Sequence, residues 1–411
     1  MTSNSDHEMR AEEPKPSPPP NGGLTAYSQV LAGFFLFFNS WGLANTFGVF
    51  QSYYSTSLLP EAGQSTISWI GSLATFLIAA SPIVWGPVFD QGHPRLLLIL
   101  GTFLVVLRLM MTSLCTQFWQ FILAQGICVG LGGGCLFLTA VAIVPSYFTT
   151  KRAIAVGGGA VGSSIGGVIY PIVFHELQPR IGFGWAVRVI GFIALATLIV
   201  PCALIKLRVE PAVDEGCAVN TFNLASLFGF MGQYIPFFYI ELYAAAHGVR
   251  PEISFYMLPI MSAGSAFGRV VPSVIADKAD RTLLVLSTCT GLAGILSLCW
   301  IAIKESVAGL IVFSVLYGFF SGAIVSLQTP SVAKLTTDFS KIGTKFGINA
   351  FFSALGVLIG SPSAGAIERM SWSGMQAFAG AALVLSAALT LLTRVVNDRK
   401  QSHSEKVLES T

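Results

Sequence analysis

A single arginine stands inside a long apolar run of this sequence. Arg269 lies in "GSAFGRVVPSVIAD", seven residues before Ala276 ends the run. An isolated charge at the centre of a membrane helix costs at least about 2.5–3.5 kcal/mol, so Arg269 needs a partner or a task. Its planar fork of donors suits an anionic ligand group held in a cavity. The alternative is an arginine that extends to the lipid headgroups or to Asp277, because a rise of ~1.5 Å per residue places it about 10 Å below the surface.

Two aspartates each end an apolar run and are followed by basic residues. Asp90 is followed by Arg95, and Asp277 is followed by Lys278 and Arg281. Such a carboxylate can cap the N-terminus of a neighbouring helix or pair with one of these bases. We expect contacts of this kind to hold one conformation and to break in another, which gives all five residues a gating role. The alternative is a set of ordinary interfacial charges.

Uncharged polar residues inside the apolar runs are candidates to line a substrate path. Buried amides also link helices to one another, so each candidate has a purely structural alternative. Glu241 is the candidate for carrying protons, since a carboxylate within a membrane can bind and release them near neutral pH. The polar candidates are Asn39, Asn45, Gln125 and Tyr170 in the first half of the chain and Gln233, Tyr234, Gln328 and Asn349 in the second half.

The composition indicates that these residues lie in a membrane protein. Of 411 residues, 53% are hydrophobic and 10% are charged, and the net charge is only +3. A soluble domain carries about 25% charged residues, so lipid must be the solvent here. The small net charge gives no indication of nucleic acid as a partner. Seven dispersed cysteines without a CxxC pair favour neither a disulfide framework nor a metal site, and no cofactor is expected.

The apolar runs are long and continuous, which favours membrane helices over a barrel. Most of the 23 Lys and Arg residues fall in alternate loops and in the tails, which places both termini in the cytosol by the positive-inside rule. The predicted spans are 26–50, 67–89, 95–114, 118–145, 153–175, 185–206, 222–245, 253–276, 282–303, 306–330, 344–367 and 374–396.

The two halves of the chain repeat one another. Asp90 and Asp277 end corresponding spans, and Pro145 and Pro330 end another corresponding pair. A repeat of six spans predicts two six-helix bundles with a substrate site between them near the midplane. The predicted units are a disordered cytosolic tail over 1–24, a bundle over 25–206, a cytosolic linker over 207–221, a second bundle over 222–396 and a cytosolic tail over 397–411.

The motifs after the second and eighth spans resemble those of the major facilitator superfamily. "GPVFDQGHPR" keeps the Gly, Asp and final Arg of the family's loop motif, and "SVIADKADR" is its counterpart in the second half. Within the superfamily, "ISWIGSL", "YIPFFYI" and "GSAFGRVVPSVIAD" look like the fungal branch of the monocarboxylate porter-like family. The animal lactate carriers of that family use a Lys, an Asp and an Arg. At those positions this chain has Asn45 or an adjacent apolar residue, Ser265 and Arg269, so only the arginine remains.

The resemblance implies a secondary active transporter that works by alternating access in the plasma membrane. The implied cargo is a small organic acid or a related metabolite, and a proton is a candidate co-substrate. Export of a fungal secondary metabolite and import of a monocarboxylate or vitamin-like nutrient are both open, as is a transporter-like sensor. No ATP-binding motif and no combination of nucleophile, base and metal ligands can be assembled from the residues, so we do not expect an enzyme.

Overall fold

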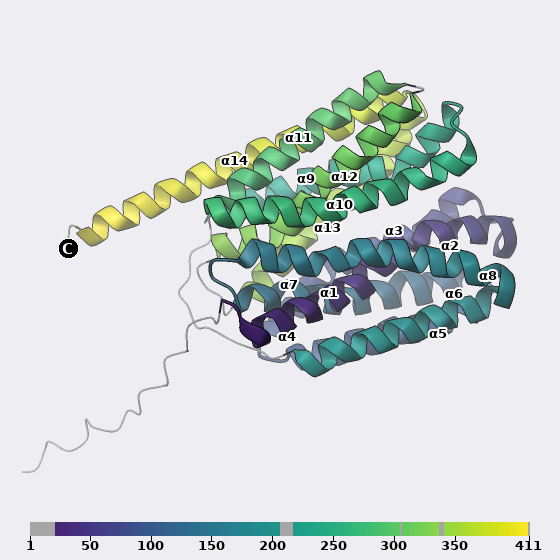
Figure 1. Ribbon diagram of the computed structural model, residues 1–411, viewed down its shortest axis with the longest axis horizontal. Coiled ribbons are helices and arrows are strands. Elements are labelled where there is room, and N and C mark those ends of the chain that lie inside the picture. The colour runs from purple at the N-terminus through teal and green to yellow at the C-terminus, as the bar shows by residue number, and fades with distance from the viewer. Residues whose placement is uncertain (1–20, 206–216, 305, 337–340, 410–411) are drawn as a thin grey trace, which may run out of the picture.

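The computed structural model describes residues 21–205, 217–304, 306–336 and 341–409. Every regular element in these ranges is a helix, which confirms the predicted all-α class. Figure 1 shows two bundles, with the first half of the chain below and the second half above. The first bundle contains α1 (Gly23–Asn45), α2 (Phe47–Tyr53), η1 (Tyr54–Leu58), α3 (Gln64–Ala80), α4 (Pro82–Asp90), α5 (Pro94–Thr112), α6 (Phe118–Phe121), η2 (Ile122–Cys128), α7 (Val129–Ser146) and α8 (Arg152–Leu204).

The second bundle has simpler elements. Each predicted span of this half is a single helix, and the prediction for 282–303 agrees with the structure at both ends. The helices are α9 (Cys217–Ala246), α10 (Pro251–Ala279), α11 (Thr282–Ile303), α12 (Val307–Leu335), α13 (Ile342–Glu368) and α14 (Trp372–Glu409).

Each of the twelve predicted spans falls on helices of the described ranges. Ten of these helices are long and apolar enough to span a membrane. One of these, α8, has 53 residues and makes two passes, because Gly182 adopts a positive φ of 78° that turns the chain back (Figure 1). The predicted span 222–245 lies in α9, which is not among the ten because its Asn, Gln and Ser residues lower its hydropathy. The fifth and sixth predicted spans are therefore joined by a glycine turn.

Proline and two π-helical segments interrupt the first bundle. The second predicted span breaks at Ser81, since Pro82 has no N–H to continue the helix. The first and fourth spans contain η1 and η2, where the backbone bonds from i to i+5. Such segments often mark functional positions in helices.

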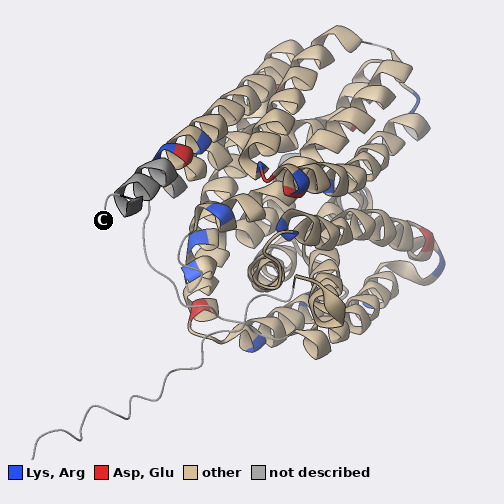
Figure 2. Ribbon diagram, turned by 60° about the vertical axis from the view of Figure 1, so that its left-hand side comes forward, with Lys and Arg blue, Asp and Glu red and all other residues tan. Residues whose placement is uncertain are grey.

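Helix α1 begins and helix α14 ends on one side of the molecule, which we call the terminal side (Figure 1). Charged residues lie mainly at helix ends, and basic residues gather on the terminal side (Figure 2). The predicted disordered tail falls mostly on residues 1–20, which lie outside the described ranges. Residues 207–216 of the predicted linker also lie outside them. Gly23 already belongs to α1, Cys217 opens α9 before the predicted 222, and α14 continues past 396 to Glu409.

Candidate functional site

Asp277 joins the end of one bundle to the beginning of a helix in the other. It lies in the last turn of α10, and its Oδ1 accepts from the backbone N–H of Ala153 at 3.0 Å. Its Oδ2 accepts from the N–H of Ile154 at 2.7 Å. These are two of the unpaired N–H groups at the start of α8, where the helix dipole also favours a negative charge. The carboxylate therefore caps a helix across the bundle interface.

Asp90 makes the corresponding contact in the opposite direction. Its Oδ1 accepts from the N–H of Gly343 at 2.9 Å, and its Oδ2 accepts from the N–H of Thr344 at 2.8 Å. The Thr344 hydroxyl donates to the same Oδ2 at 2.6 Å. Here the first bundle supplies the acid and α13 of the second bundle supplies the helix N-terminus. The internal repeat thus produces two equivalent contacts, both on the terminal side.

The basic residues expected beside these acids do not pair with them. Arg95, Lys278 and Arg281 are exposed, and their side chains form no ion pair or hydrogen bond with the described residues. The sequence allowed each aspartate to contact either a helix N-terminus or a basic side chain. In the structure both aspartates contact a helix N-terminus. The reason is geometric: backbone N–H groups at a close helix crossing are already fixed, whereas a long basic side chain must give up conformational freedom to pair.

Arg269 is buried between the bundles, with 7% of its surface exposed. Its Nη1 donates to the carbonyl oxygen of Ala160 at 2.7 Å, which crosses from α10 to α8. Its Nε lies 3.5 Å from the hydroxyl of Ser265, at the limit of a hydrogen bond. The guanidinium reaches neither Asp277 nor the surface, so the structure favours the buried alternative over the extended one.

Four aromatic rings meet across the same interface, and we call them the aromatic cluster: Trp41, Phe137, Tyr234 and Phe346. Trp41 stacks on Tyr234, with centroids 6.3 Å apart and ring planes at 13°. Phe137 contacts Trp41 and Phe346 edge to face, each with centroids at 5.6 Å. Nε1 of Trp41 is buried and has no acceptor among the described residues. Tyr234 is also close enough to Arg269 to interact with it electrostatically.

The sequence reasoning did not identify Trp41, Phe137 or Phe346. Aromatic residues are common in apolar spans, so their type alone carries little signal. Trp41 could have been noticed as an indole donor inside an apolar run, because a buried indole N–H usually has a partner.

Three of the predicted substrate-binding residues lie inside a bundle. Asn39 accepts from the Tyr170 hydroxyl at 2.8 Å and donates to the Thr197 hydroxyl at 2.9 Å, which links α1 to both arms of α8. Asn349 accepts from Gln328 at 2.7 Å and donates to Asn223 at 2.9 Å. These amides satisfy one another across helices, so we leave Asn39, Tyr170 and Asn349 out of the proposed substrate path.

Two further candidates, Asn45 and Glu241, are exposed. Asn45 is the last residue of α1 and lies against Gly167 of α8. Glu241 lies on α9, seven residues beyond Tyr234. Since seven residues make almost two helical turns, both side chains project from the same face of α9, with Glu241 about 10 Å farther from the terminal side.

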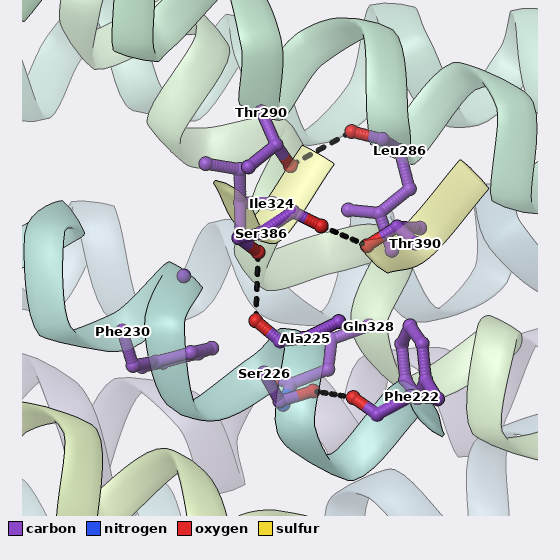
Figure 3. A pocket seen from close by; sticks show the side chains of 11 residues that line it. Phe222, Ala225, Ser226, Phe230, Leu286, Thr290, Ile324, Gln328, Ser386 and Thr390 are labelled. Carbon is purple, nitrogen blue, oxygen red and sulfur yellow. Dashed lines mark hydrogen bonds between the residues drawn. The ribbon is translucent and has the colours of Figure 1, made fainter. Parts of the chain in front are cut away.

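A small pocket lies within the second bundle, away from the bundle interface (Figure 3). Its volume of about 20 Å³ has room for one water molecule and not for a metabolite. The hydroxyls of Ser226, Thr290 and Ser386 each donate to a backbone carbonyl. Within the described ranges no group of three or more His, Cys, Asp or Glu could hold a metal ion.

Arg108 is buried although it lies near the end of the third predicted span. A long basic side chain at such a place can extend to the surface, but only 3% of Arg108 is exposed. Its Nε has no partner among the described residues. Arg108 therefore points into the first bundle.

Comparison with known proteins gives the same architecture. The family model described as Major Facilitator Superfamily matches residues 29–302 and, in an overlapping match, residues 222–410. The chain is 44% identical to the MFS-type transporter dbaD of Emericella nidulans, over 88% of this chain and 84% of that protein. It is 37% identical to the aspyridones efflux protein apdF of the same species, over 93% of this chain and 80% of that protein.

A solved structure agrees with the fold. The fucose:proton symporter FucP of Escherichia coli superimposes with a TM-score of 0.70 over 89% of this chain and 98% of that chain. The sequences share 16% identity, so this likeness concerns the fold alone.

Proposed function

The chain belongs to the major facilitator superfamily, among fungal MFS-type transporters, and from this premise we propose that it exports a small anionic metabolite by alternating access. Its relative apdF is named an efflux protein for aspyridones, and this name supports export over import. The observation that carries the proposal is the pair of aspartate caps with Arg269 beside them at the bundle interface.

The hydrogen bonds of Asp90 and Asp277 to the opposite bundle hold the terminal side of the protein closed in this proposal. Each carboxylate is held by N–H groups of the other bundle, and hydrogen bonds to a charged group are worth about 1.5–3 kcal/mol. The contacts between bundles described above lie from the middle of the spans to the terminal side. In this proposal the terminal side is the cytosolic side, so the conformation described here is closed toward the cytosol. Separation of both caps opens it.

The substrate class follows from the donors at the interface. Arg269 uses Nη1 for Ala160 and keeps further N–H groups, and the Trp41 indole N–H has no acceptor among the described residues. Together with the flat faces of Trp41 and Tyr234, these donors suit an organic acid with a planar or aromatic body. We place the protein in the monocarboxylate porter-like family and in the plasma membrane, with both termini cytosolic.

Proton coupling is assigned to Glu241. It is the acid on the face of α9 that carries Tyr234, and it lies toward the side opposite the terminal side. The position that holds an Asp in the animal lactate carriers is Ser265, so the coupling proton needs another carrier. Asn45 completes the proposed path at the end of α1.

A flux assay tests the proposal. Purified protein is reconstituted into vesicles and presented with a panel of organic acids and their neutral amide analogues, with and without a pH gradient. We expect flux of at least one acid and none of its amide, and a control variant at an exposed residue outside the proposed path retains full flux. The matched control is Arg180→Gln, since Arg180 is exposed and pairs with Glu176 one turn before it. No flux of any solute would favour the sensor alternative. Equal flux of the amides would contradict the anionic substrate class.

A further inference from the structure

The first bundle contains a buried positive charge with no acid to neutralise it. Arg108 is 3% exposed and forms no hydrogen bond or ion pair with any described residue. The groups that interact with it electrostatically are Tyr54, Tyr170 and Cys128, all of which are neutral near pH 7. A buried unpaired charge costs several kcal/mol, so the folded protein must compensate it.

Unused hydrogen-bonding groups surround this charge. The Tyr54 hydroxyl donates to Oε1 of Gln125 at 3.0 Å, which orients the amide and leaves its Nε2 buried without an acceptor. Thr112, one turn after Arg108 on α5, has a buried hydroxyl without a partner among the described residues. Gln125 and Cys128 belong to η2, and Tyr54 belongs to η1. Both π-helical segments of the first bundle therefore contribute side chains that lie near Arg108.

The unused groups are mostly donors. Arg108 Nε, Gln125 Nε2 and the Thr112 hydroxyl can each donate to a ligand. The walls are apolar, since Phe50, Phe121 and Phe183 pack around the Tyr54 ring. A positive charge among donors and aromatic walls is complementary to a small anion that brings acceptors and a single negative charge.

We propose that Arg108, with Gln125 and Thr112, binds a small monovalent anion or anionic group inside the first bundle. The site is separate from Arg269, which lies at the bundle interface. The anion is either a halide such as chloride or a carboxylate, and both satisfy the same donors. This proposal does not rest on the transport function, because it concerns how the folded bundle neutralises its own charge.

Thermal unfolding of the purified protein in nanodiscs tests the site. The buffer contains gluconate, which is too large to enter, and is titrated with chloride in one arm and with formate or acetate in another. A ligand that binds only the folded state raises the Tm by a constant step for each tenfold rise in its concentration above Kd, about 1.5–2 °C for a chain of 411 residues. The arm that responds identifies the source of the anion.

Two variants and one control make the test specific. Arg108→Gln removes the positive charge, so the Tm of this variant should no longer depend on the anion concentration. Gln125→Glu supplies a carboxylate within the site and should also abolish the dependence, while leaving the protein at least as stable in gluconate as the wild type. Arg188→Gln alters an arginine that already has partners in Ser113 and Trp185, so the dependence should remain.

The proposal is overturned if the wild type shows no dependence on chloride or on either carboxylate. It is also overturned if Gln125→Glu responds to anions as the wild type does. The second variant keeps the test decisive even where Arg108→Gln fails to fold.

Discussion

Asp277 accepts a hydrogen bond from the backbone N–H of Ile154 at 2.7 Å, although the two residues belong to different bundles. The contact ties the last turn of α10 to the first turn of α8. Asp90 repeats it with α13, so two acids in equivalent positions of the repeat close the same side of the molecule. A conformational change that separates the bundles must break both contacts.

We predict that Asp277→Asn shifts the protein toward a conformation that is open on the terminal side. The amide can keep one acceptor but loses the charge and one of the two N–H contacts, at a cost of about 1.5–3 kcal/mol to the closed state. Ser273 is fully buried at this interface and becomes the reporter as Ser273→Cys in a background without other cysteines. A thiol reagent applied from the terminal side should label it roughly tenfold faster or more.

The matched control is Asp280→Asn, three residues farther along. Asp280 pairs with Lys334 at the surface, and exposed pairs contribute only about 0–1 kcal/mol. Labelling at an unchanged rate in Asp277→Asn, or at an equally raised rate in both variants, would contradict a gating role.

The second prediction concerns the close crossing of α8 and α10. A Cβ added at Gly157 would lie 2.3 Å from the carbonyl oxygen of Arg269, whereas one at Gly158 would meet only a Val30 methyl at 3.6 Å. Gly157→Ala should therefore force the helices apart and raise labelling of the same reporter, while Gly158→Ala should not. Equal labelling rates in the two variants would contradict this prediction. They would show that α8 and α10 can accommodate the added methyl group while the terminal side stays closed.

The acid caps could be predicted from the sequence because their signal is local. Each aspartate ends an apolar run, and the equivalent positions of Asp90 and Asp277 show the repeat that pairs the bundles. Length and hydropathy also predict most of the membrane helices, since ten helices of the described ranges are long and apolar enough to span a membrane. The turn at Gly182 and the breaks at η1 and η2 could not, because they depend on how neighbouring helices pack.

Burial of polar groups was harder to predict than their presence. The sequence shows that Asn39, Asn349 and Arg108 lie in apolar runs but does not show toward which neighbour each side chain points. Rotation about the helix axis decides whether Asn39 lines a path or bonds to Tyr170. The same rotation turns Arg108 inward, where charge and span position alone predict a surface residue.

The third prediction separates linking residues from substrate-binding residues. Tyr170→Phe removes the hydroxyl that donates a hydrogen bond to Oδ1 of Asn39 at 2.8 Å. Hydrogen bonds between membrane helices contribute about 0.6 kcal/mol on average and at most about 1.7. We expect a loss of stability in that range, measured by unfolding in detergent and denaturant, and an unchanged KM for transport. A clearly raised KM at wild-type stability would return Tyr170 to the substrate path.

Glu241→Gln tests the proposed proton route. The amide is close to the carboxyl in shape but carries no exchangeable charge, so transport driven by a pH gradient should be lost while exchange of substrate for substrate continues. The measurement compares gradient-driven flux with exchange in the same vesicles. Gradient-driven flux at the wild-type rate would exclude Glu241 as the proton carrier.

Counterflow in reconstituted vesicles tests the central claim most directly, because it requires alternating access and needs no driving ion. Vesicles loaded with an unlabelled organic acid are diluted into a trace of the labelled acid. We predict transient accumulation of label by the wild-type protein and none by Arg269→Gln, whose folding and reconstitution are verified by its unfolding profile. Counterflow at the wild-type rate in Arg269→Gln, or no counterflow of any acid in the wild type, would contradict transport through the interface that Arg269 occupies.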